Sequence, residues 1–568
     1  MTQPLPRRRM LTASAGALAL VWMPVPRAEA VPAGADCPAP PDFPAGVEHY
    51  RQSYRNWAGE LRADDVWTAV VRTAQDVVTL ANWAHRHGFA LRPQGFRHGW
   101  APLTLTAGTD CASRVVLVDT RRLNAMELGG PGAEPGSATV RVQAGAGLEA
   151  LLGFLEAAGY GLTATPAPGD LSVGGALAVD AHGTAVPAEG EVRPPGTTYG
   201  SLSNLILRLT AVVWDPGAGA YVTRSFERTD PDCAALLTNL GRAFLTEVTL
   251  LAGPLARLRC VSRVDIPAAE LFAAPGAGGR TLESFIAASG RVEAIWFPFT
   301  ARPWLKVWSV SPQRPPTSRP VTGPYNYPFS DNVPAPVADL AGRILAGQYE
   351  LAPALGQAQY AATAAGLLAT ASADLWGAAK NLQLYVRPTT LHVHANGYAV
   401  RVPRSGVQAV VHAFANFYTA LLLAHAARGR FPVNGAVEIR VTGVDDPAEV
   451  AVPGAQAPAL SALRPDSARP AGQVAVWFDV LTLPGTADAN RFYREVERYL
   501  LTAHPGTRVE WSKGWAYTDQ AAWSDPDVLD RAVPSSFGPG WPIAVAALDR
   551  LDPARVFSNP FLDRLLRS

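Results

Sequence analysis

Two glycine-bearing stretches decide the fold: Arg92-Pro93-Gln94-Gly95-Phe96-Arg97-His98-Gly99-Trp100-Ala101-Pro102-Leu103 and Gly169-Asp170-Leu171-Ser172-Val173-Gly174-Gly175-Ala176-Leu177, the second continuing to Ala181-His182-Gly183-Thr184. Each places glycines and small polar residues after an apolar run. Glycine lets backbone N–H groups approach a diphosphate, and successive N–H groups form an anion-binding nest. Two ordinary turns are the alternative. No G-x-G-x-x-G opens a helix, so the sequence does not support a Rossmann fold.

Helices and strands alternate around these two loops. Apolar spacing predicts helices over 73–85 and 148–158 and strands over 90–93, 114–119 and 138–145. After Cys260 the pattern becomes that of antiparallel strands, with added helices. The strands are predicted over 291–298, 304–308, 438–441 and 474–478, the helices over 354–382 and 407–425, and a long loop over 311–337. The tail from about Glu510 has no core of its own and should pack onto an earlier domain.

Length and composition restrict the class of protein. A chain of 568 residues suits two or three domains, and 48% apolar residues allow a large core. With 49 basic and 48 acidic residues there is no positive excess for nucleic acid. Cys37, Cys111, Cys233 and Cys260 lack CxxC spacing, so no metal site is predicted and their pairing stays open. His392-x-His394 lacks a further ligand nearby that would complete one.

The N-terminus has the plan of an export signal over residues 1–30. Arg7-Arg8-Arg9 precedes an apolar stretch from Leu11 to Met23, and Ala28-Glu29-Ala30 follows. The arginine run before a modest apolar region favours the twin-arginine route. The stretch is too short for a membrane anchor, which needs roughly 20 residues, and no later segment is predicted to cross a membrane. We expect a periplasmic or secreted protein beginning near Val31.

With residues 140–147 between them, the two loops resemble the FAD domain of the vanillyl-alcohol oxidase (p-cresol methylhydroxylase) flavoproteins, and 199–204 and 242–250 continue the likeness. The resemblance covers about 56–255. It implies an α+β, two-domain flavoprotein: an FAD-binding domain over 31–258, an antiparallel-sheet cap over 259–509 and a C-terminal segment over 510–568 returning to the FAD domain. The FAD-binding residues it implies are Gly95, Phe96, Arg97, His98, Gly99, Trp100, Ser172, Val173, Gly174, Gly175, His182, Gly183 and Val248.

His98 matches the family position that can bond covalently to the flavin 8α-methyl carbon. A neutral imidazole is a competent nucleophile for that bond, whereas the alternative is a loop residue hydrogen-bonded to backbone. No cysteine lies beside the second loop, so the resemblance implies a single covalent bond. His182 is expected to support the second loop.

The cap resembles the type II cholesterol oxidases at 292–300, 303–308 and 435–440, and the C-terminal segment resembles them at 510–515. Alditol and aldonolactone oxidases usually carry a His-Trp-Gly-Lys signature near the C-terminus. Here the equivalent stretch reads Glu510-Trp511-Ser512-Lys513, which weakens the carbohydrate alternative. The resemblance implies oxidation of cholesterol and related 3β-hydroxysteroids by molecular oxygen, with Δ5 to Δ4 isomerisation and release of hydrogen peroxide. An alditol or aldonolactone oxidase stays open, as does a sterol-binding protein without catalysis.

Charged residues of the cap are the predicted catalytic groups. Glu438 and Arg440 are two apart on a predicted strand and so share one face. In an apolar cavity each charge would need a partner, whereas a solvated strand face is the alternative. We expect Glu438 as base, Arg440 as its partner, Glu293 as a second carboxylate and Lys513 as a positive charge near the flavin. Expected partners are a sterol, oxygen and, transiently, a membrane surface touched by loops within 311–337.

Overall fold

The computed structural model describes residues 37–163, 165–167, 170–331, 333–383, 392–466 and 472–567. The predicted export signal and Gly169 of the second loop lie outside the described residues.

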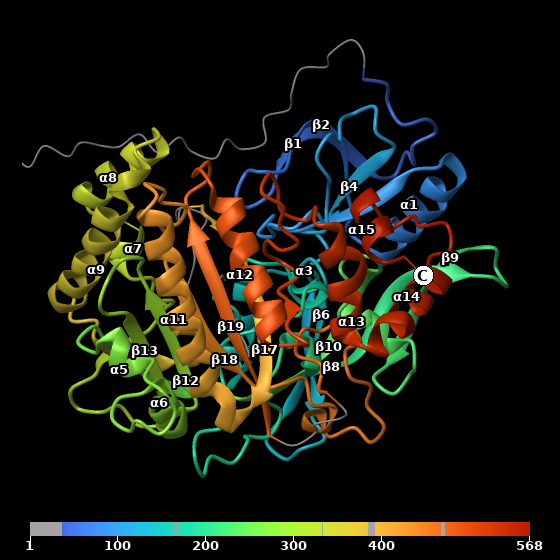
Figure 1. Ribbon diagram of the computed structural model, residues 1–568. Helices are drawn as coiled ribbons and strands as arrows, with labels where there is room; N and C mark the ends of the chain where they lie inside the picture. Colours follow the sequence, from blue (N-terminus) through green and yellow to red (C-terminus); the bar gives the residue numbers. More distant parts are fainter. Residues whose placement is uncertain are drawn as a thin grey trace, which may run out of the picture.

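Two sheets form the N-terminal half (Figure 1). The first has the order β1 (Glu48–Arg55), β2 (Arg62–Val70), β4 (Val115–Asp119) and β3 (Ala90–Gln94). The second is antiparallel, in the order β5 (Met126–Pro131), β6 (Ala138–Gln143), β10 (Phe244–Pro254), β8 (Ile206–Asp215) and β9 (Ala220–Glu227), with β7 (Tyr160–Gly161) pairing β10. The predicted strands near 90, 115 and 138 are therefore confirmed.

Four helices accompany these sheets: α1 (Ala74–His87), α2 (Leu148–Ala157), α3 (Val173–Ala178) and α4 (Cys233–Leu236). α1 begins at a capping box in which Thr73 accepts from the Asp76 amide and the Asp76 side chain accepts from the Thr73 amide. It ends at Gly88, whose φ of 66° suits glycine. The two helices predicted from apolar spacing are confirmed.

The cap is one mixed sheet with helices over both faces. Its order is β14 (Arg319–Val321), β15 (Asp374–Ala378), β11 (Arg257–Arg263), β13 (Trp304–Val310), β12 (Arg291–Trp296), β18 (Val437–Thr442), β19 (Gln473–Thr482), β17 (Tyr398–Pro403) and β20 (Arg508–Val509), with β16 (His394–Ala395) pairing β19. Among these strands β14 and β15 pair in parallel and the other pairs are antiparallel.

The cap helices are α5 (Ala268–Leu271), α6 (Leu282–Ser289), α7 (Pro328–Asp331), α8 (Ala335–Leu345), α9 (Ala352–Ala369), α10 (Ala379–Leu382), α11 (Val407–Ala426) and α12 (Ala489–Ala503). α11 and α12 lie over the β18–β19 region (Figure 1). Phe414 of α11 stacks on Phe478 of β19 with ring centroids 4.0 Å apart. Because side chains alternate along a strand, the neighbours of Phe478 point to the opposite face of the sheet.

Two predictions for the cap need correction. The helix expected over 354–382 ends at Ala369, and Asp374–Ala378 forms strand β15, paired with β11. Ala371 has a φ of 50°, which ends the helix, and pairing with β11 overrides the helical preference of alanine. The loop expected over 311–337 contains β14 and α7.

One later segment, Arg404–Ala426, is long and apolar enough by composition to span a membrane, with a mean hydropathy of 1.5, contrary to expectation. A core helix passes the same test, and the buried Val411, Phe414 and Tyr418 pack this segment into the core.

The C-terminal helices α13 (Val533–Phe537), α14 (Gly540–Leu551) and α15 (Pro560–Leu565) lie beside the N-terminal half (Figure 1). Phe557 belongs to the same buried cluster as Trp83 of α1. The amide of Leu91 donates to the Val556 carbonyl at 2.7 Å, and the Arg92 side chain donates to the Phe557 carbonyl. The end of the chain thus buttresses the strand that leads into the first glycine-bearing loop.

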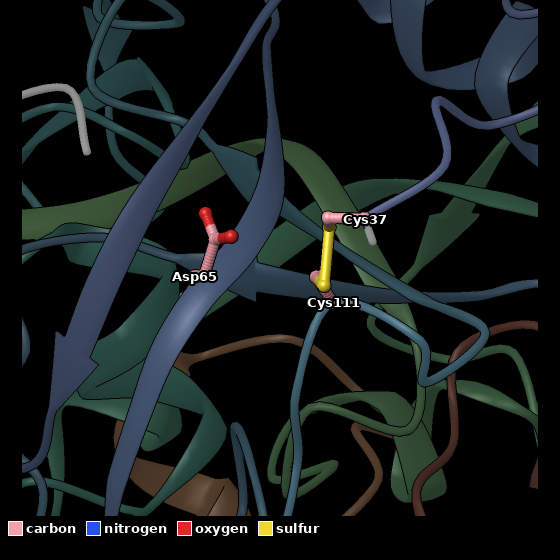
Figure 2. Close-up of side chains that lie close together, drawn as sticks. All are labelled: Cys37, Asp65 and Cys111. Carbon is pink, nitrogen blue, oxygen red and sulfur yellow. A yellow bond between two sulfur atoms is a disulfide. The ribbon is translucent and has the colours of Figure 1, made fainter. Parts of the chain in front are cut away.

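Cys37 and Cys111 form a disulfide, whereas Cys233 and Cys260 are buried thiols. The disulfide ties the start of the described chain to the segment between β3 and β4 (Figure 2). Asp65 lies close to both sulfurs, but its carboxylate pairs with Arg51 at 2.8 Å. Among the described residues, these three form the one group of His, Cys, Asp and Glu side chains close enough to share a metal ion. The two cysteine sulfurs, however, are bonded to each other.

A buried ion pair between Arg242 and Asp552 joins the C-terminal segment to the N-terminal half, with atoms 2.5 Å apart and side chains 0% and 3% exposed. Arg242→Met should lower the free energy of unfolding by about 3–5 kcal/mol, because it strands a buried carboxylate. Urea unfolding followed by tryptophan fluorescence measures the loss. Arg531→Met, in an exposed pair with Asp527, is the matched control and should change stability little. Equal losses in both variants would contradict the prediction.

Candidate active site

A cavity of about 540 Å³ lies between the two glycine-bearing loops and the cap sheet. The N-terminal half contributes residues 92–101 and most of residues 171–182, and the cap contributes residues of strands β12 and β18. The predicted residues that line it are Gly95, Phe96, Arg97, His98, Gly99, Trp100, Ser172, Gly174, Gly175, His182, Glu293, Glu438, Arg440 and Lys513. Gly183 lines a smaller adjoining pocket. Val173 and Val248 are buried in the core and line neither pocket.

The backbone of the first loop is available to a ligand. In the described chain, the amides of residues 95–99 donate to no protein group. Arg97 has a φ of 62°, and its side chain turns away to donate to Gln52 at 2.5 Å and to the Ser53 carbonyl at 3.2 Å. A run of unpaired amides facing a cavity is suited to a diphosphate.

The second loop is packed tightly against its surroundings. The amides of Val173 and Gly174 donate to the carbonyls of Ala146 and Ala144 at 2.9 and 2.7 Å. The Gly175 amide donates to Ser172 Oγ at 3.3 Å, which caps α3. A Cβ on Gly174 would lie 2.9 Å from that of Ala144, so only glycine fits.

The two loops touch each other. A Cβ on Gly95 would lie 2.3 Å from Ser172 Oγ. A side chain at this position would therefore push the loops apart.

His98 is held by aromatic and acidic neighbours. Its ring stacks on Trp57 with centroids 3.8 Å apart, and the opposite face of Trp57 stacks on His392 at 3.9 Å. His98 Nδ1 lies 3.3 Å from Asp170 Oδ1, and only 8% of the residue is exposed. The imidazole is thus fixed in orientation at the wall of the cavity.

Trp100 links the first loop to the cap and the C-terminal segment. Its indole N–H donates to the Val393 carbonyl at 2.7 Å, and its amide donates to the Ser512 carbonyl at 2.8 Å.

His182 is a neutral ring below the second loop. Burial lowers its pKa to about 3. The ring stacks on Trp477 with centroids 3.7 Å apart, and Nδ1 lies 3.0 Å from the Gly183 carbonyl. Its other nitrogen lies 3.9 Å from Glu510. The ring thus joins the second loop to strand β19 of the cap.

The register of the cap strands gathers the predicted catalytic residues. Glu293 of β12 lies directly opposite Arg440 of β18, and Ile295 lies opposite Glu438. Glu438 and Arg440 therefore share one face, as predicted, and their charged atoms are 4.0 Å apart. Their side chains are only 19% and 11% exposed, so this is not a solvated strand face.

Asp479 of β19 completes the group and was missed in the sequence. It lies opposite Glu438, is fully buried, and forms ion pairs with Arg440 and, at 2.6 Å, with Lys513. Lys513 also contacts Glu510 at 3.2 Å. The only signal was one acidic residue in a strongly apolar strand.

Burial and neighbouring charge compete in this cluster. Burial raises the pKa of Glu293 and lowers that of Lys513. Burial acts against the charge of Arg440 too, but Glu438 and Glu510 outweigh it and raise the Arg440 pKa. Burial would also raise the pKa of Glu510, but chiefly Lys513 brings it below its usual value. The site thus combines an arginine that stays charged with a lysine whose charge is disfavoured by burial and a glutamate whose pKa is raised.

Comparisons with known proteins agree with this geometry. Residues 257–567 match the family model described as cholesterol oxidase, substrate-binding, and residues 67–215 match the FAD binding domain. No curated protein matched the chain.

Among solved structures, one described as a solvent-stable cholesterol oxidase is 54% identical, with a TM-score of 0.91, over 93% of this chain and 100% of that chain. Cholesterol oxidase from B. sterolicum is 44% identical, with a TM-score of 0.90, over 94% and 100%. A xylooligosaccharide oxidase from Myceliophthora thermophila is 12% identical, with a TM-score of 0.56, over 89% and 93%, and shares the fold alone. With its family match over more than half of the sequence and 44–54% identity across most of it, this chain belongs to the FAD-dependent cholesterol oxidases.

Proposed function

We propose that this protein oxidises the 3β-hydroxyl group of cholesterol and related sterols to a 3-ketone, moves the double bond from Δ5 to Δ4 and releases hydrogen peroxide. The observation that supports this most is the single cavity described above. Unpaired loop amides line one side of it, and Glu438, Arg440 and Glu293 line the other. A cofactor and a substrate hydroxyl could therefore meet at charged groups that are shielded from water.

The rest of the cap wall suits a sterol better than a sugar. Its lining is largely apolar: Ile295, Phe297, Trp304, Phe329, Val337 and Leu355. A rigid hydrocarbon skeleton gains free energy by leaving water for such a surface. Sugar hydroxyls would each need a polar partner, so the alditol and aldonolactone alternative is not favoured.

The residues of the first loop fit FAD, because they line the cavity and their amides have no protein partner in the described structure. Bound FAD supplies the hydride acceptor. On the protein side, Glu438 accepts the hydroxyl proton, and Arg440 holds that carboxylate and stabilises the negative charge that develops on oxygen. Glu293 is the second carboxylate, and it carries a proton from C4 to C6 of the steroid. Lys513 provides positive charge on the cofactor side of the cluster.

We further propose export by the twin-arginine route, with molecular oxygen as the second substrate. The Cys37–Cys111 disulfide supports export, because disulfides persist in oxidising compartments. A transient contact with a membrane surface through 311–337 would bring the sterol close, since Phe329 and Val333 of this segment line the cavity.

The protein should release peroxide with cholesterol and not with xylitol or gulonolactone. Glu438→Gln keeps the shape of the side chain but cannot accept a proton, so turnover of cholesterol should fall by about 10²–10⁴-fold. The rate of peroxide release measures both the substrate preference and the loss of turnover in the variant. Glu127→Gln, in an exposed pair with Arg141, is the matched control. Turnover of xylitol above that of cholesterol would contradict the assignment of cholesterol as the substrate. Near-normal turnover of cholesterol by Glu438→Gln would contradict the assignment of Glu438 as the base.

We propose that FAD is bonded through the His98 imidazole to the flavin 8α carbon. Acid precipitation should then leave a yellow pellet, and His98→Ala should release the flavin into the supernatant. His392→Ala changes the ring on the far side of Trp57 and should keep the pellet yellow. A colourless pellet from the unchanged protein would rule out the bond.

A further inference from the structure

Lys306 of β13 is a buried cation without a conventional partner. The residue is 0% exposed, and its ammonium group has no hydrogen-bonding partner in the described structure. Three aromatic rings surround the ammonium: Trp304, Trp308 and Tyr327 have their centroids 5.3, 4.7 and 4.9 Å from Nζ. Burial lowers the pKa of Lys306, and cation–π attraction offsets part of that cost. The remaining cost calls for a negative charge nearby.

The register of the sheet supplies that charge. Lys306 lies directly opposite Glu293, and Glu293 lies directly opposite Arg440 on its other side. Directly opposed residues of antiparallel strands have Cβ atoms about 4.5–5.5 Å apart, and their side chains share one face. Glu293 therefore stands in a row between two cations, one on β13 and one on β18.

Several other groups face this row. Glu438 opposes ionisation of Glu293, whereas Lys306, Arg440 and Lys513 favour it, and Lys306 is the strongest of these charges. Arg291, on the same strand, is paired with Glu191 at 2.7 Å. On the far side of Lys306, burial raises the pKa of the Cys260 thiol to about 11 and that of Tyr327 well above its usual value, so both are neutral.

We propose that Lys306 is a positioning residue whose charge keeps the Glu293 carboxylate ionised, and thereby controls the isomerisation step. The inference rests on the proposed function, in which Glu293 moves the proton from C4 to C6. The aromatic rings fix the ammonium, and the strand pairing places Lys306 beside Glu293 on one face of the sheet. Lys306 does not line the cavity, so it does not contact the substrate hydroxyl group.

Lys306→Met tests this role in the holoenzyme, with 5-cholesten-3-one as the substrate and the absorbance of the conjugated enone as the readout. Without the cation the pKa of Glu293 rises, so less of the carboxylate is ionised at pH 7. The acid limb of the isomerisation profile should move upward by about one pH unit or more. The rate at pH 7 should fall on the order of tenfold and recover as the pH rises. Lys306→Arg retains the charge and should keep the profile.

Lys380→Met removes the same kind of charge from an ion pair with Glu156, outside the cavity lining, and serves as the matched control. Its profile should not move. A Lys306→Met profile that overlies that of the unchanged protein would overturn the proposal. Glu293→Gln separates this failure from that of the proposed function: if Glu293→Gln isomerises normally, the assignment of Glu293 is wrong irrespective of Lys306.

An infrared difference spectrum gives a second readout that does not depend on the folding of a lysine variant. At the pH of fastest isomerisation, the unchanged holoenzyme should lack a protonated-carboxyl band that disappears in Glu293→Gln. Such a band in the unchanged protein would show that Glu293 is neutral there and would overturn the proposal. In Lys306→Met the band should appear at neutral pH and vanish as the pH rises.

Discussion

A buried carboxylate cannot remain charged without partners, and the arrangement of this active site depends on that constraint at Asp479. Asp479 contacts Arg440 of the neighbouring strand and Lys513 of the C-terminal segment. The residue before Lys513, Ser512, accepts hydrogen bonds from the amides of Trp100 and Ala101 in the first glycine-bearing loop. One fully buried acid thus fixes the cofactor loop relative to the cap sheet, although these segments lie far apart in the sequence.

The cluster around this acid is not electrically balanced. Its carboxylates outnumber its cations by one, and the members are Glu293, Glu438, Asp479, Glu510, Lys306, Arg440 and Lys513. Removing water strengthens every repulsion among the carboxylates, so the excess charge favours uptake of one proton. Burial directs that tendency to Glu293, whose pKa is raised, and the charge of Lys306 opposes it. Such an imbalance destabilises the fold, but it gives the site a carboxyl group able to accept and return a proton.

The sequence predicted which residues share one face of a strand, but not which residues lie opposite them on the neighbouring strand. The two-residue spacing of Glu438 and Arg440 predicted a shared face, because side-chain alternation is a local property of the strand. Asp479 was missed because its partners depend on register, which is set by packing of the whole sheet. The same limit explains β15: an alanine-rich run favours a helix locally, but pairing with β11 decides the structure. The Cys37–Cys111 pairing likewise requires the folded chain.

Glycine serves two different physical purposes in loops that look alike in the sequence. In the first loop the amides of residues 95–99 are unpaired and these residues line the cavity, so Gly99, whose Cβ position is open, keeps the backbone accessible to a ligand, whereas Gly95 is required by packing against Ser172. In the second loop the amides of Val173 and Gly174 are bonded to residues 146 and 144, and Gly174 is required by close packing. The second loop therefore acts as a rigid support for the first. The unpaired amides of the first loop and His98 lie on one short segment, which brings the proposed anion site and the proposed covalent bond together.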